Sequence, residues 1–223
     1  MSGRVAKIDE LELYPIEGQD GLTWRPVRRH FDIQAFGVNA YTADEAGLRL
    51  VEEHREENGH EELYVVVSGR ARFILDRESH DAPAGTLVHC TSGTLREAFA
   101  EEPGTTVLGI GAKPGEIFKP SGWEWTFAGM SLLTQGQEEA ARREFEAGIE
   151  AYPDEWQGYY NMACAEARLG NRDAALENLA RAAEVNEEVV AKYAPEDSDF
   201  ASLKDDPEFL RLTGQAGSGS SRS

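Results

Sequence analysis

The residues best suited to chemistry gather in one short stretch, from His54 to Glu62. Two imidazoles and four carboxylates fall within these nine positions. Imidazole nitrogens and carboxylate oxygens are the ligands that Mn, Fe, Ni or Zn take up in proteins. An apolar run at residues 63–67 follows at once and ends at the turn Ser68-Gly69, which predicts a buried strand and a hairpin. Polar groups that directly precede such a strand predict a site inside a small β-barrel.

The alternation of side chains along a strand predicts which of these residues face the same way. Glu62 and Tyr64 share one face, and His54 and Glu56 share another. His60 lies beside them on the connecting loop. We therefore expect His54, Glu56, Glu62 and Tyr64 to contribute to one binding site.

This stretch resembles the first cupin motif, in which glycine precedes two histidines, a glutamate and a second glycine. Gly47 leads the stretch, and Glu62 stands seven positions before Gly69, as the motif requires. His54 occupies the place of the first histidine. Glu56 occupies the place of the second.

A counterpart of the second cupin motif follows. Gly85, Thr91, Gly93 and Arg96 fall at its four fixed positions, so that threonine replaces the proline and arginine replaces the ligand histidine. The resemblance covers roughly residues 24–115. It implies a jelly-roll barrel with His54, Glu56, Glu62 and Arg96 clustered inside.

Three interpretations of this cluster stay open. His54, Glu56 and Glu62 could hold a divalent metal ion (Mn, Fe, Ni or Zn), with His60 or His89 in reserve. Alternatively, Arg96 excludes a metal and pairs with Glu62 or with the carboxylate of a bound ligand. The third interpretation is a buried Arg–Glu network that only stabilises the barrel.

The composition excludes two classes of partner. The 223 residues include 41 acids and 22 bases, which gives a formal net charge of -19. This charge argues against nucleic acid and against anionic membrane surfaces, both of which require Lys and Arg. No apolar run approaches the length of a membrane span. With only two cysteines, Cys90 and Cys164, and no apolar signal core at the N-terminus, we expect a cytoplasmic chain.

Short β-type segments separated by turn residues fill the first half of the chain and predict a barrel or sandwich. The cupin resemblance selects the jelly-roll barrel. The predicted strands are residues 27–33, 35–41, 48–51, 63–67, 71–75, 86–90, 95–99 and 105–110.

The second half contains a helical repeat of 34 residues. Trp125 and Tyr159, Gly136 and Gly170, and three further pairs of similar residues recur at this spacing, which is that of a tetratricopeptide (TPR) unit. The repeat predicts helices at residues 123–135, 137–151, 156–169 and 171–185, with one or two capping helices after residue 196.

The predicted fold class is therefore α+β, with an all-β jelly-roll barrel followed by an all-α TPR-like domain. The predicted layout is an N-terminal arm (1–23), a cupin barrel (24–115), a linker (116–122), a TPR-like helical domain (123–213) and a disordered tail (214–223).

Fold alone does not define function. The first hypothesis is a cupin-type protein that binds a small molecule, with its helices docked on the barrel or on a protein partner. The second is a metal-dependent enzyme, of dioxygenase or isomerase type, that acts on a small polar substrate. The third is a scaffold protein. A homodimer formed through the barrel is expected in each case.

Overall fold

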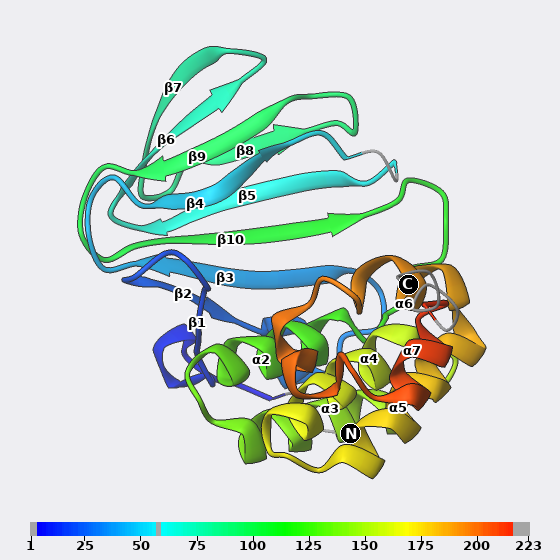
Figure 1. The fold of residues 1–223 in the computed structure, drawn as a ribbon. Coiled ribbons are helices and arrows are strands. Elements are labelled where there is room, and N and C mark those ends of the chain that lie inside the picture. Colours follow the sequence, from blue (N-terminus) through cyan, green and yellow to red (C-terminus); the bar gives the residue numbers. More distant parts are fainter. Residues whose placement is uncertain (1–3, 57–58, 216–223) are drawn as a thin grey trace. The chain divides into compact units, whose positions relative to one another are not determined.

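The computed structural model describes residues 4–56 and 59–215, and the chain divides into two units, Met1–Pro120 and Ser121–Ser223. The first unit consists almost entirely of strands, and the second of helices (Figure 1). The predicted α+β class is confirmed. Most of the predicted tail, 214–223, lies outside the described residues.

In the described part of the first unit there are ten strands and two short helices. Its elements are η1 (Ile8–Glu10), β1 (Tyr14–Pro15), β2 (Leu22–Arg25), α1 (Val27–Phe31), β3 (Gly37–Ala43), β4 (Arg49–His54), β5 (Glu61–Ser68), β6 (Arg70–Leu75), β7 (Glu78–Pro83), β8 (Leu87–Cys90), β9 (Arg96–Ala100) and β10 (Thr105–Ala112).

These strands form two antiparallel sheets, in the orders β1-β2-β3-β10-β5-β8 and β4-β9-β6-β7. The pairs are nested along the chain, because β3 pairs with β10, β4 with β9, β5 with β8 and β6 with β7. Figure 1 shows β3, β10 and β5 side by side, with β4 and β9 in the next layer. Nested pairing of this kind is the topology of a jelly roll.

Alternate residues of the paired strands fill the space between the two sheets. Val66, Phe73, Ala98 and Val107 have no exposed surface, and the ring centroids of Tyr64 and Phe73 lie 5.5 Å apart. This apolar core holds β4, β5 and β9 in place, and these three strands carry the candidate site.

The prediction of a strand at residues 27–33 is wrong, because this segment forms the short helix α1. The helix ends at Asp32, whose left-handed backbone (φ 55°) directs its N–H to the carbonyls of Arg28 and Arg29. The Arg28 side chain is buried and donates to the Ile33 carbonyl at 3.3 Å. A short helix with a buried arginine therefore stands where strand pairing was expected.

The strand β2 was missed, and so was β7. Five of its six residues are exposed, and it pairs only with β6 at the edge of the four-stranded sheet. A polar edge strand lacks the apolar alternation on which strand prediction depends. The two-residue turn before it, Asp76-Arg77, has positive φ at both positions.

Up to residue 215, where the description of the chain ends, the second unit contains two consecutive helix pairs and a cap. Its elements are α2 (Trp123–Thr134), α3 (Glu138–Ala151), α4 (Trp156–Arg168), α5 (Arg172–Val185), α6 (Glu187–Tyr193), η2 (Ser198–Leu203) and α7 (Pro207–Leu212). The turns within each pair contain Gly136 (φ 71°) and Gly170 (φ 78°), a backbone conformation that costs little only for glycine. No helix among the described residues is both long and apolar enough to cross a membrane.

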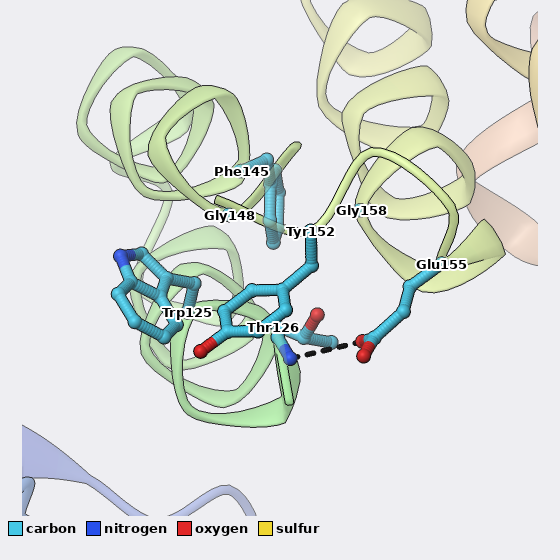
Figure 2. Close-up of a pocket in the computed structure, with 8 residues that line it drawn as sticks. Trp125, Thr126, Phe145, Gly148, Tyr152, Glu155 and Gly158 are labelled. Carbon is cyan, nitrogen blue, oxygen red and sulfur yellow. Dashed lines mark hydrogen bonds between the residues drawn. The ribbon is translucent and has the colours of Figure 1, made fainter. Parts of the chain in front are cut away.

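The helix pairs pack through small residues opposite large ones. A Cβ atom added at Gly129 would lie 2.2 Å from the Phe145 ring, so glycine is required where α2 meets α3. Trp125, Tyr152 and Glu155 line a hollow beside Phe145 (Figure 2), and Glu155 accepts a hydrogen bond from the Gly122 N–H at 2.9 Å. Phe145 itself has no exposed surface.

Candidate functional site

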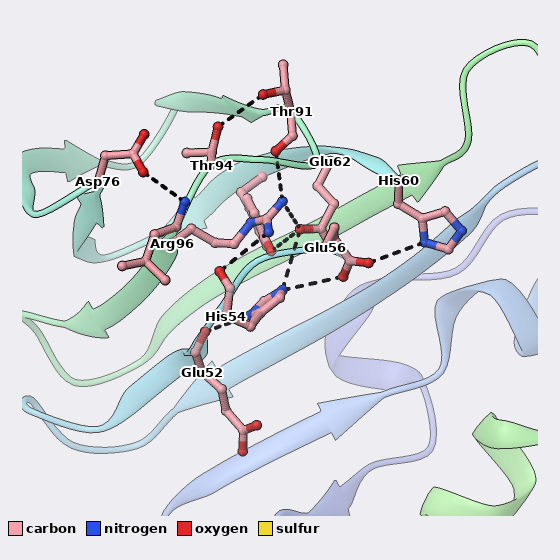
Figure 3. Close-up of polar contacts among 11 residues, drawn as sticks. Glu52, His54, Glu56, His60, Glu62, Asp76, Thr91, Thr94 and Arg96 are labelled. Atoms are coloured by element: carbon pink, nitrogen blue, oxygen red, sulfur yellow. Dashed lines mark hydrogen bonds and ion pairs between the residues drawn. The ribbon is translucent and has the colours of Figure 1, made fainter. Parts of the chain in front are cut away.

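The predicted site residues meet at one end of the barrel, where the two sheets approach each other. His54 ends β4 and lies directly opposite Arg96, the first residue of β9. Glu62 lies near the start of β5, in the other sheet, opposite Cys90 of β8. Figure 3 shows the side chains of His54, Glu56 and Glu62 pointing toward one another.

Glu62 is the centre of the cluster, because three groups converge on one of its oxygens. The Tyr64 hydroxyl donates to Oε2 at 2.7 Å. A guanidinium nitrogen of Arg96 lies 3.2 Å from the same atom, and His54 Nε2 lies 3.8 Å from it. The Glu62 carboxylate is therefore held in place from three sides.

Arg96 lies at the bottom of the cluster and has no exposed surface. Besides Glu62, its guanidinium donates to the backbone carbonyls of His54 at 3.5 Å and Thr91 at 3.3 Å. Its Nε atom has no hydrogen-bond partner among the described residues. A buried guanidinium stays charged, so Glu62 is its essential counter-ion.

The other side of the cluster opens to solvent. Glu56 bridges two imidazoles, with 3.5 Å to His54 Nε2 and 3.8 Å to His60 Nδ1. The exposed fraction of the side chains falls from 36% at His60 and 35% at His54 to 20% at Glu56, 19% at Glu62 and zero at Arg96. A molecule from solvent therefore meets imidazoles and carboxylates before it meets the guanidinium.

These contacts determine the charge of each group. Burial is the largest influence on Glu62 and tends to raise its pKa, but the contacts with His54, Tyr64 and Arg96 outweigh burial, so the pKa lies below its usual value. The contact with Glu62 raises the pKa of His54. Burial, followed by the charge of Glu62, raises the pKa of Tyr64. Glu62 is therefore a carboxylate at neutral pH, and Tyr64 is a neutral donor.

The structure brings together all six residues that the sequence placed in the binding or metal site: His54, Glu56, His60, Glu62, Tyr64 and Arg96. His89, held in reserve as a ligand, is exposed and lies outside the barrel, since its neighbours Val88 and Cys90 face the interior. Sequence reasoning missed the Thr91 carbonyl and the Cys90 thiol, because only the pairing of β5 with β8 places Cys90 beside Glu62.

The cupin resemblance implies a metal ion, and the residues present fit one. One nitrogen of His54 and one oxygen each of Glu56 and Glu62 all lie within 4.8 Å of one another. Metal–ligand bonds of about 2.0–2.2 Å place two ligands of one ion about 3–4 Å apart, which matches the separations around His54 Nε2. One imidazole and two carboxylates suit Mn, Fe or Zn. Arg96 opposes a cation, but it contacts Glu62 at Oε2 from the buried side.

Comparison with known proteins supports the helical half of the predicted architecture. The tetratricopeptide repeat family matches residues 157–189, in the second helix pair. No curated protein matches the chain in sequence.

Several solved cupin structures resemble the strand half. KdgF from Halomonas sp. is 20% identical, with 49% of this chain and 93% of that chain covered and a TM-score of 0.42. A sugar phosphate isomerase of the cupin superfamily from Silicibacter pomeroyi has the same identity and TM-score, with 49% and 76% covered. An RmlC-like cupin from Shewanella frigidimarina is 17% identical, with 51% and 95% covered and a TM-score of 0.39. The strand pairing of the first unit gives a jelly-roll barrel, and the family match gives TPR-like helices in the second.

Proposed function

We propose that the barrel binds a small polar molecule through a divalent metal ion held by His54, Glu56 and Glu62. The convergence of these three donors carries the proposal. They come from β4, the loop after it and β5, yet their ligand atoms lie within 4.8 Å of one another on the solvent side of a buried cation. A structural network would not need the imidazoles of His54 and His60 at the open side.

Each residue has a distinct part in this function. His54, Glu56 and Glu62 supply the ligand atoms, and a metal ion bound there would act as a Lewis acid toward an oxygen of the small molecule. Arg96 and Tyr64 hold the Glu62 carboxylate in one orientation and keep it anionic. Hydrogen bonds that orient a metal-ligating side chain in this way fix the geometry of metal sites.

A metal-dependent enzyme of dioxygenase or isomerase type is the second candidate. The pair formed by His60 and Glu56 favours it, because an imidazole and a carboxylate 3.8 Å apart at the solvent edge are groups that general acid–base catalysis uses. The substrate class stays a small polar molecule. A protein partner bound by the TPR-like helices also stays a prediction.

Calorimetric titration with Mn, Fe, Ni and Zn tests the metal site. We expect one ion per chain for the wild type. We expect His54→Ala and Glu62→Gln each to weaken metal binding by at least about tenfold, because each removes a metal ligand. Loss of a group that only supports a ligand already weakens binding by about tenfold. His89→Ala is the matched control, because this histidine is exposed on the outside of the barrel. Equal affinities for all four proteins would exclude the site.

The homodimer stays a prediction as well. In the six-stranded sheet, β8 is an outermost strand, and its pairing among the described residues is with β5. Strands at the edge of a sheet favour pairing with another chain. Light scattering at micromolar concentration should therefore give twice the chain mass. A mass near 24.6 kDa would contradict the prediction.

A further inference from the structure

One exposed carboxylate outside the site, that of Asp76, connects the two segments that carry the site residues. Its Oδ1 atom accepts from the Leu95 N–H at 3.1 Å and lies 3.3 Å from a guanidinium nitrogen of Arg55. Its own N–H donates to the Leu95 carbonyl at 2.8 Å. We propose that Asp76 is a positioning residue. It keeps the segment that carries His54 and Glu56 in register with the segment that ends at Arg96. This inference rests on the proposed metal site.

Arg55 connects Asp76 to the segment that carries His54 and Glu56. It stands between His54 and Glu56, so its side chain leaves the chain on the side opposite to theirs. There its guanidinium donates both to Asp76 and to the Gly93 carbonyl. The segment that carries two of the three metal ligands is thus fixed from outside the cluster.

Leu95 connects Asp76 to the segment that ends at Arg96. Two hydrogen bonds join Asp76 and Leu95, and Leu95 directly precedes Arg96. The same segment contains Thr91, whose carbonyl accepts from Arg96, and Thr94, whose N–H donates to that carbonyl at 3.1 Å. Figure 3 shows Asp76, Thr91 and Thr94 around the start of β9. Holding this segment therefore holds the guanidinium that orients Glu62.

The backbone conformation of the turn that contains Asp76 is compatible with this positioning role. Asp76 and Arg77 form the two-residue connection between β6 and β7, with φ values of 48° and 75°. Such a turn matches the twist of the flanking strands, and aspartate tolerates the left-handed conformation better than most residues. Leu75 pairs with Arg96, so the turn begins beside the arginine.

The ion pair itself contributes little to stability. The Arg55 and Asp76 side chains are 51% and 60% exposed, and solvent screens such pairs. The effect of Asp76 should therefore appear in the geometry of the metal site more than in the melting temperature. This difference separates a positioning role from a structural one.

The test compares full-length variants by Co²⁺ titration, followed by the visible absorption of the bound ion. Asp76→Ala should weaken Co²⁺ binding by about tenfold and change its absorption spectrum, as the loss of a supporting group does in other metal sites. Asp76→Asn keeps an oxygen for the Leu95 N–H and should restore most of the affinity. Asp81→Ala is the matched control, since Asp81 lies in the same hairpin, is 63% exposed and pairs with Arg70 at 2.6 Å.

The outcomes distinguish the two proposals. A wild type that does not bind Co²⁺, Mn, Fe, Ni or Zn overturns the metal site and this inference together. A wild type that binds, with the affinity and spectrum unchanged in Asp76→Ala, overturns the positioning role alone. The same holds if Asp76→Ala and Asp81→Ala weaken binding equally, or if Asp76→Asn restores nothing.

Discussion

Replacing Arg96 by alanine is expected to destabilise the barrel by about 3 kcal/mol, because it leaves the Glu62 carboxylate without its buried counter-ion. The guanidinium has no exposed surface and lies 3.2 Å from Glu62 Oε2. The loss of one partner of a buried pair costs about 3–5 kcal/mol, and the lower end applies here since Glu62 is 19% exposed and keeps some contact with water. The vacated space between β4 and β9 adds to the cost.

Urea unfolding followed by circular dichroism measures this loss. Arg70→Ala is the matched control, because Arg70 lies in the same four-stranded sheet and pairs with an aspartate at 2.6 Å, but its side chain is 43% exposed. We expect little change in that variant, since solvent screens the pair. If the two alanine variants unfold at the same urea concentration, Arg96 does not stabilise the barrel.

Phe145→Ala should destabilise the helical unit by about 3–5 kcal/mol, the usual cost of removing a fully buried phenylalanine ring. The ring has no exposed surface and fills the space that Gly129 leaves between α2 and α3. The hollow lined by Trp125 and Tyr152 lies next to it (Figure 2), so removal of the ring enlarges an existing gap. Helix pairs with few neighbours depend strongly on such contacts.

Thermal and urea unfolding, monitored at a helix signal, test this expectation. Tyr193→Ala serves as the control, because this aromatic residue of α6 is 50% exposed, and surface changes of this kind stay within about 0.5 kcal/mol. A loss in Phe145→Ala no greater than in Tyr193→Ala would show that the two helices do not pack through this ring.

Local patterns were sufficient for most of the elements. The apolar runs at residues 63–67 and 71–75 predicted β5 and β6, because one face of each strand is buried and every second residue must be apolar. Gly136 and Gly170 predicted the turns between helices, because each adopts a positive φ that other residues avoid. In both cases the physical constraint acts within a few residues of the chain.

Among the elements that escaped these patterns, α1 and β7 show the reason. The segment that forms α1 is charged and owes its conformation to a buried arginine that bonds to the Ile33 carbonyl. The strand β7 lies at the edge of its sheet, and five of its six residues are polar or exposed. In both segments the pattern of buried and exposed side chains departs from the periodicity on which the prediction depends.

The sequence by itself determined the two architectures, the end of the barrel that carries the polar residues, and the identity of the residues that meet there. Only the tertiary structure decided that Arg96 pairs with Glu62, that the imidazoles face solvent, and that Asp76 connects the two site segments. Arg96 and the His54 carbonyl that it contacts are 42 residues apart in the chain. The register of β4 against β9 and of β5 against β8 sets such contacts, and packing between the two sheets fixes that register.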